Sequence, residues 1–259
     1  MTDKLIAFDA DGVLIDSEKE ILITSWNEYN LWKKDKGLPY QEFTVSYQDI
    51  PNTFIQTYTA FRSYTTKSYH RIAVDLLIFE EISPQKINYE VIHQIYEADE
   101  SKKGKILSRV KAIRSRIREE SNMDQLIERY DQVDYEWIEE IHAEGKLYLI
   151  TNNPFSICDF SNIAFEPDSK YVRTSETGVT NKSIHLNNLI HERGIQPGNV
   201  LFIDDSLDVL KEVDAGTDIP SNNLFQNSWA PKRKFKSNSA YQILDFAEIK
   251  NKFENLDES

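Results

Sequence analysis

The sequence predicts an α/β fold in which a doubly wound parallel sheet is interrupted by a long helical insertion. Short apolar runs typical of buried strands recur at residues 5–8, 146–150 and 199–203. Helical patterns follow the last two of these runs, and strands that alternate with helices form parallel βαβ units. Between residues 17 and 130 the periodicity is helical, with no convincing strand. We therefore expect a Rossmann-like core that carries an inserted all-helical domain.

The first strand ends in an unusual arrangement of charge. Asp9 and Asp11 follow it directly, and Gly12 allows the chain to turn sharply. Carboxylates two residues apart in an extended segment point the same way and repel each other, so the pair favours a cation or a shared proton. Mg²⁺, which prefers oxygen ligands, is the natural partner. A turn that is acidic without any function is the alternative.

The insertion and the core can be delimited from the patterns around them. Ser17, with Glu20 three residues on, has the spacing of a capping box and predicts a helix start. We place the inserted domain at residues 17–130 and the core at residues 1–16 and 131–259. Within the core, helices are predicted to end at Gly145, Gly194 and Gly216, and residues 241–253 are predicted to form a last helix.

Four short motifs stand in order along the core. They are Asp9-x-Asp11, Thr151 after the second strand, Lys182 at the start of a helical pattern, and Asp204-Asp205 after the third strand. In this order they resemble the motifs of the haloacid dehalogenase-like (HAD) superfamily of hydrolases. The residues after Gly12 are similar to its phosphoglycolate phosphatase and β-phosphoglucomutase branch. That resemblance implies that the helical insertion is a C1-type cap over the active site.

The resemblance also implies a role for each motif residue. Asp9 would attack phosphorus and form an aspartyl-phosphate. Asp11 would protonate the leaving alcohol and then deprotonate water; its presence points to phosphate transfer, since dehalogenases proper lack this acid. Thr151, Asn152 and Lys182 would donate to the phosphoryl oxygens.

A metal site is implied by the same resemblance. Mg²⁺ would be bound by the Asp9 and Asp205 carboxylates and the backbone carbonyl of Asp11. Asp204 would belong to the metal shell as well. For Asp208, a place in the first turn of a helix is favoured over a hydrogen bond to this shell.

Composition limits the possible partners and compartment. A net charge of −13 argues against nucleic acid or an anionic membrane as the main partner. The chain shows no secretory signal and no run of apolar residues long enough to span a bilayer. One cysteine, Cys158, suits a reducing compartment. We expect a cytoplasmic protein, with no signal for its oligomeric state.

The sequence therefore predicts a Mg²⁺-dependent phosphatase that acts on a small phosphorylated metabolite. A phosphomutase of the same superfamily is the first alternative, and a catalytically silent binding or regulatory protein of this fold is the second. Two basic segments each have a functional and a simpler interpretation. The first could contact substrate or form a solvated helix face; it comprises Arg109, Lys111, Arg114, Arg116 and Arg118. The second, residues 232–236, could be a targeting patch or a solvated loop. The simpler interpretation is favoured for both.

Overall fold

A computed structural model gives the fold of the chain. It describes residues 4–62, 78, 100–151, 172–174, 181–229 and 241–256. The chain divides into two compact units, one made of residues 1–16 with 128–259 and the other of residues 17–127. Three features singled out in the sequence lie outside the described residues: Asn152, Cys158 and the basic segment 232–236.

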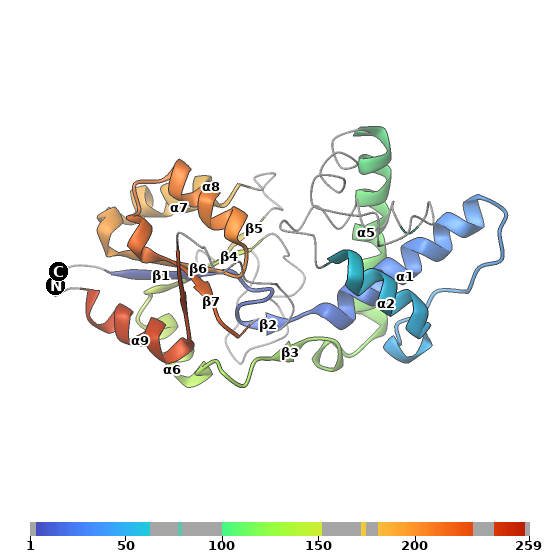
Figure 1. The fold of residues 1–259 in the computed structure, drawn as a ribbon, viewed down its shortest axis with the longest axis horizontal. Helices are drawn as coiled ribbons and strands as arrows, with labels where there is room; N and C mark the ends of the chain where they lie inside the picture. Colours follow the sequence, from blue (N-terminus) through green and yellow to red (C-terminus); the bar gives the residue numbers. More distant parts are fainter. Residues whose placement is uncertain are drawn as a thin grey trace. The chain divides into compact units, whose positions relative to one another are not determined.

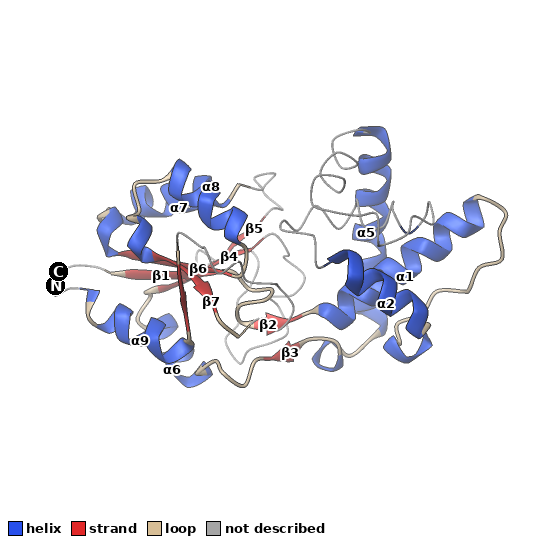
Figure 2. Cartoon of the chain, viewed as in Figure 1, coloured by secondary structure: helices blue, strands red, loops and turns tan. Residues whose placement is uncertain are grey.

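The first unit is built on a parallel sheet (Figures 1 and 2). Its strands are β1 (Leu5–Phe8), β4 (Leu147–Thr151), β5 (Val172–Thr174), β6 (Val200–Asp204), β7 (Leu224–Asn227) and β8 (Gln242–Leu244). They form one six-stranded sheet in the order β5-β4-β1-β6-β7-β8, with every pairing parallel. This confirms the predicted α/β class and doubly wound sheet.

The order of the strands explains their composition. Strand β1 lies at the centre, where Ile6 is in register with both Leu147 of β4 and Leu201 of β6. Every residue of β1, β4 and β6 is buried, because helices cover both faces of the sheet, and such strands become continuous apolar runs. That is why these three were visible in the sequence.

Helices lie on both faces of the sheet (Figure 1). On one face α7 (Lys182–Arg193) and α8 (Leu207–Gly216) bury Leu186, Leu189, Leu210 and Val213 against the strands. The other face is covered by α6 (Tyr135–Ala143) and α9 (Phe246–Glu254). There Phe8 and Trp137 both pack on Phe246, with ring centroids 6.4 and 5.6 Å apart.

The second unit is helical in its described residues. It comprises α1 (Glu18–Asp35), α2 (Asn52–Arg62), α5 (Glu100–Glu120) and two short 3₁₀ turns, η1 (Tyr47–Asp49) and η3 (Met123–Gln125). Helices α1 and α5 pack against each other. An aromatic cluster joins α1 to α2, in which the Trp26 and Phe54 rings lie 4.9 Å apart edge to face. On α5, Val110, Ile113 and Ile117 are buried.

A pair of short strands stands where the chain leaves the first unit and returns to it. Strand β2 (Ile15–Asp16) pairs antiparallel with β3 (Glu128–Arg129). Tyr135 reinforces this pairing, because its hydroxyl donates to the carbonyl of Leu14 and accepts from the backbone N–H of Tyr130 at 3.2 Å. The two connecting segments are therefore held side by side within the first unit.

Several local predictions were wrong or incomplete. The stretch 123–130 was predicted to be helical, but it forms η3 and strand β3. The last helix begins at Phe246, after strand β8, where Asp245 and Glu248 form a capping box. Ser17 precedes α1 without a side-chain cap; Glu20 instead accepts from Thr24 Oγ1 at 2.8 Å. Glycine ends α6 and α7 as predicted, with Gly145 and Gly194 at φ 71° and 63°.

Two 3₁₀ turns lead into strands of the first unit, η6 (Pro197–Asn199) before β6 and η7 (Ser221–Asn223) before β7. They set the points at which those strands enter the sheet. Within the residues that the structure describes, no helix is long and apolar enough to cross a membrane.

Candidate active site

Polar and charged side chains that the sequence predicts to be functional gather where three neighbouring strands end. Thr151 is the last residue of β4, Asp9 follows β1, and Asp204 is the last residue of β6. Since these strands are adjacent and parallel, their carboxyl ends lie at one edge of the sheet, where ligands bind in open α/β folds. The Asp9 N–H donates to the carbonyl of Ile203 at 2.9 Å, so the ladder between β1 and β6 continues to this residue. Asp9 and Thr151 are buried, with 9% and 2% of their surface exposed.

Lys182 joins two of the aspartates. Its Nζ lies 2.9 Å from Asp9 Oδ1 and 2.7 Å from Asp204 Oδ2. Lys182 is the first residue of α7, whose N-cap Asn181 accepts from the backbone N–H of Ser183 at 2.8 Å. A cation is slightly unfavourable at a helix N-terminus, and the two carboxylates offset that cost.

The remaining hydrogen bonds orient the carboxylates. Asp9 Oδ1 also accepts from the backbone N–H of Ala10 at 2.8 Å, and Asp204 Oδ1 accepts from the backbone N–H of Ser206 at 2.8 Å. Both oxygens of Asp204 are thus engaged, one by Lys182 and one by the residue that precedes α8. Asp204 therefore holds Lys182 in place and fixes the start of that helix.

Asp205 lies directly against the turn that follows β1. Gly12 has φ 82°, and a Cβ added to it would stand 2.3 Å from Asp205 Oδ2 and 2.8 Å from Asp205 Cγ. Only glycine fits here, because it both adopts a positive φ readily and leaves room for the carboxylate. This contact brings the loops after β1 and β6 together.

The acidic residues fit a divalent cation. Asp9, Asp204 and Asp205, all buried, each offer a carboxylate oxygen, and these oxygens lie within 4.8 Å of one another. Two oxygens bound to one Mg²⁺ are at most about 4.2 Å apart, so the cluster is close to the size of such a site. If all three carboxyl groups are ionised, they leave two uncompensated negative charges beside one lysine, which a divalent cation would neutralise.

The protonation of Asp9 reflects the same imbalance. Burial raises the pKa of its carboxyl to about 8, since Lys182 only partly opposes burial and the aspartates at 204, 205 and 11 raise the pKa further. Burial also opposes the charge on Lys182, but Asp204 and Asp9 outweigh it and raise the pKa of the ammonium. A bound cation beside Asp9 would lower the pKa of that carboxyl and favour its ionised form.

Asp11 lies in the turn after β1, partly buried, and forms an isolated bridge with Ile15. Its carboxylate is not one of the three that cluster within the described residues. Asp208 lies in the first turn of α8, 3.7 Å from Lys211 Nζ, which agrees with the preferred helical interpretation.

Arg109 and Arg114 of α5 pair with α1, which the preferred prediction of a solvated face did not anticipate, whereas Lys111 and Arg116 are exposed, as that prediction expects. Arg114 Nη2 lies 2.8 Å from Glu20 Oε2, and Arg109 pairs with Glu28 and Asp35 of α1. Arg116 is more exposed; it pairs with Glu120 and lies 3.9 Å from the centre of the Phe43 ring.

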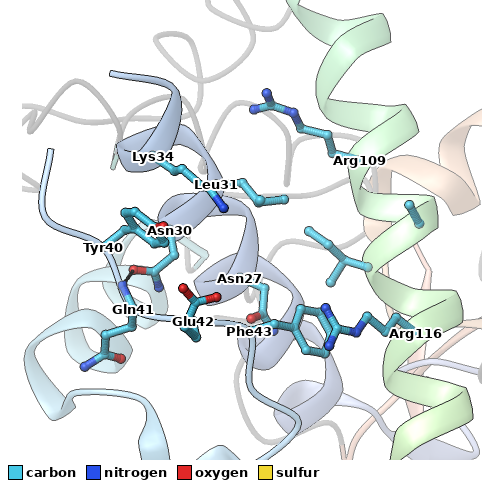
Figure 3. A pocket seen from close by; sticks show the side chains of 12 residues that line it. Asn27, Asn30, Leu31, Lys34, Tyr40, Gln41, Glu42, Phe43, Arg109 and Arg116 are labelled. Carbon is cyan, nitrogen blue, oxygen red and sulfur yellow. Dashed lines mark hydrogen bonds between the residues drawn. The ribbon is translucent and has the colours of Figure 1, made fainter. Parts of the chain in front are cut away.

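A pocket of about 300 Å³ lies in this unit, between α1, α5 and residues 40–43 (Figure 3). Arg116 crosses the Phe43 ring at its wall, and Asn30 and Gln41 are joined by a hydrogen bond of 2.8 Å. None of the clustered carboxylates lines it.

Three residues near the cluster were not predicted from the sequence to belong to the site. Gln226, Asn227 and Trp229 lie at the end of β7 and just beyond it, and each donates to a backbone carbonyl of a loop that carries the aspartates. Polar residues at the end of an apolar strand were the available signal, but hydrogen bonds to backbone carbonyls require no fixed spacing in the sequence.

Comparisons with known proteins give a family match and several similar structures. The family model of the haloacid dehalogenase-like hydrolases matches residues 4–211. A protein from Lactobacillus delbrueckii subsp. bulgaricus that is proposed to be a phosphoglycolate phosphatase has a similar structure, with a TM-score of 0.61 and 13% identity over 97% of this chain and 98% of the other.

Two further solved structures are similar. A predicted phosphoglycolate phosphatase from Haemophilus somnus gives a TM-score of 0.57 and 17% identity over 97% of this chain and 98% of the other. A haloacid dehalogenase-like hydrolase from Streptococcus pneumoniae gives a TM-score of 0.54 and 12% identity over 96% of this chain and 98% of the other. No curated protein matches the sequence. At these identities the structures show a shared fold.

Proposed function

Since this chain belongs to the haloacid dehalogenase-like hydrolases, we propose that it is a Mg²⁺-dependent phosphatase that hydrolyses a small phosphorylated metabolite through an aspartyl-phosphate. The observation that carries the proposal is the group formed by Asp9, Lys182 and the aspartates 204 and 205 at one edge of the sheet. The proposed activity of two structural neighbours, phosphoglycolate phosphatases, supports the choice of a phosphomonoester.

Asp9 is the proposed nucleophile. Its Oδ1 is held by Lys182 and by the N–H of Ala10, so the carboxylate is fixed with one oxygen bound to donors. The other oxygen, Oδ2, attacks phosphorus as the bond to the ester oxygen breaks. Lys182 neutralises charge that develops on the phosphoryl group, and Thr151 at the end of the neighbouring strand β4 donates a hydrogen bond to it.

Asp11 is the proposed general acid and base. It lies two residues beyond Asp9 in the turn that Gly12 makes possible. It gives its proton to the departing alcohol and then takes a proton from the water that attacks the aspartyl-phosphate. That second attack breaks the bond between phosphorus and Asp9, releases inorganic phosphate and restores both carboxyl groups.

The metal site is proposed at Asp9 and Asp205, with the backbone carbonyl of Asp11 and the neighbouring Asp204. Asp204 acts mainly through Lys182, since both of its oxygens already accept hydrogen bonds. When bound, Mg²⁺ would offset the charge of the phosphoryl group and the carboxylates and help orient the phosphate. Asn152, next to Thr151, is proposed as a further phosphate donor.

Replacement of the nucleophile tests the proposal. Asp9→Asn keeps the size of the side chain and removes its anionic oxygen, so turnover of p-nitrophenyl phosphate and of a panel of phosphorylated metabolites should fall at least about 10³-fold. Inorganic phosphate release, measured with Mg²⁺, is the readout, and circular dichroism checks the fold. Asp208→Asn, in the first turn of α8, is the control and should retain activity. A loss of only a few-fold in Asp9→Asn would contradict the role of Asp9.

A further inference from the structure

The stretch at the end of β7 reaches the two loops that carry the clustered aspartates. Gln226 Nε2 donates to the carbonyl of Asp205 at 2.9 Å, Asn227 Nδ2 to that of Gly12 at 2.8 Å, and Trp229 Nε1 to that of Val13 at 2.7 Å. All three side chains are buried, and Asn227 has no exposed surface. The proposed catalytic mechanism uses none of them.

The carbonyls that accept these bonds belong to the parts of the backbone that set the geometry of the site. Gly12 and Val13 form the turn directly after Asp11, and Asp205 supplies a carboxylate of the cluster. The Asp205 carboxylate already lies against Gly12. A displacement of either loop would therefore change the distance between the Asp205 oxygens and those of Asp9.

Such a displacement is what electrostatics favours in the absence of a restraint. Three buried carboxyl groups share one lysine, and those that are ionised repel one another strongly in a medium of low dielectric constant. Neutral N–H donors on backbone carbonyls can hold the loops in place without adding charge to the cluster. They would thereby preorganise the ligands before a cation arrives.

We propose that Gln226, Asn227 and Trp229, the β7 clamp, are positioning residues of the metal site. The proposal rests on the proposed function, because it takes the acidic cluster to be that site. The clamp fixes the loops after β1 and β6 relative to each other, and its contribution is to the affinity for the cation more than to the stability of the fold.

Strand β7 offers a matched control for the experiment. Asn223, just before the strand, also donates its Nδ2 to a glycine carbonyl at 2.8 Å, that of Gly198, and is also buried. Asn223→Ala and Asn227→Ala each remove one hydrogen bond from an asparagine amide to a glycine carbonyl, and the two asparagines lie at opposite ends of β7. Mn²⁺ binding, followed by electron paramagnetic resonance, measures the affinity for a cation independently of turnover, and thermal unfolding measures stability.

Asn227→Ala should weaken Mn²⁺ binding about 10-fold or more, as loss of an outer hydrogen bond does at metal sites. Asn223→Ala should lose comparable thermal stability but bind Mn²⁺ within about twofold of wild type, since its amide is remote from the loops that bear the aspartates. Gln226→Met, which keeps the length of the side chain and removes the donor, should weaken binding as well. It provides the test if Asn227→Ala fails to fold.

Unchanged Mn²⁺ affinity in both clamp variants, or equal losses in Asn227→Ala and Asn223→Ala, would overturn the clamp. Absence of Mn²⁺ binding by the wild-type protein would overturn it too. If wild type binds Mn²⁺ and the clamp variants do not, but no phosphomonoester is hydrolysed, the clamp stands and the proposed function fails. If wild type hydrolyses phosphomonoesters and the clamp variants bind Mn²⁺ as tightly as wild type does, the proposed function stands and the clamp fails.

Discussion

Lys182 illustrates how one residue shapes the electrostatics of the site. Its ammonium is buried at the first position of a helix, where burial and the helix dipole both oppose a positive charge. Contacts of 2.7 and 2.9 Å to Asp204 and Asp9 reverse that balance. Because it neutralises only part of the cluster, the site retains a negative charge that favours a cation.

Gly12 provides a prediction about a single residue. Gly12→Ala should lower phosphatase activity at least about 10-fold, because the new methyl group would displace the Asp205 carboxylate from its position and so disturb the metal ligands. The positive φ adds about 1–2 kcal/mol of backbone strain. Phosphate release at saturating Mg²⁺, together with thermal unfolding, measures both effects.

Gly194→Ala separates the loss of activity from the loss of stability. Gly194 also has a positive φ, 63°, in the same unit, but nothing lies within 4 Å of an added Cβ. This variant should lose a similar amount of stability and keep its activity. Equal activity in the two variants would show that the contact between Gly12 and Asp205 is unimportant for catalysis.

Among the helices, the pairing of α1 with α5 relies on partly buried ions. Arg114 has 13% of its side chain exposed and Glu20 has 5%, whereas the Arg116–Glu120 pair is about half exposed, at 53% and 44%. Breaking a buried pair leaves a charge without its partner in a poorly solvated place, which costs far more than the loss of a surface pair.

Arg114→Ala should therefore destabilise the protein by about 3 kcal/mol. Arg116→Ala, on the same helix, should cost less than about 1 kcal/mol, which covers both its exposed ion pair and its contact with Phe43. Unfolding by urea, followed by circular dichroism, compares the two. Similar destabilisation in both would argue against an important buried pair, and addition of Glu20→Gln to Arg114→Ala should recover part of the loss.

Strands differed in how clearly the sequence revealed them. Strands β1, β4 and β6 are buried on both faces, so their apolar runs were predicted. Strand β8 lies at the edge with Gln242 and Ile243 exposed, and only half of β7 is apolar. Burial on both faces produces the signal only where the buried residues are apolar; β7 is also buried throughout, but its last two residues are the polar Gln226 and Asn227.

The residues of the cluster were accessible from sequence for a different reason. Asp9, Lys182 and the aspartates 204 and 205 were predicted because their order along the chain, at strand ends and a helix start, resembles the motifs of the haloacid dehalogenase-like hydrolases. Gln226, Asn227 and Trp229 act on backbone carbonyls, which every residue has, so no pattern of side chains marks their partners. The pairings of Arg109 and Arg114 likewise depend on how α1 packs against α5, which periodicity alone does not specify.

For the molecule as a whole, the charge of the cluster predicts a dependence on metal. Removal of divalent cations with EDTA should abolish phosphate release, and added Mg²⁺ should restore it. Ca²⁺ should substitute poorly, because it prefers more ligands at longer distances and would misplace the phosphoryl group. Assays in buffers of defined metal content provide the test; full activity in the presence of the chelator would contradict the proposed metal site.

The position of β1 in the sheet also has a consequence for biosynthesis. This strand is made first, yet its partners begin at Leu147 and Val200, so at roughly 5–20 residues per second its backbone groups wait about 10–40 s for the second neighbour. Residues 17–127 form a contiguous unit and can fold while the ribosome completes the sheet. An apolar segment that remains unpaired this long is a natural binding site for chaperones, and Asp9, the proposed nucleophile, can meet the aspartates 204 and 205 only when most of the last strand-ending loop, in the final quarter of the chain, has emerged.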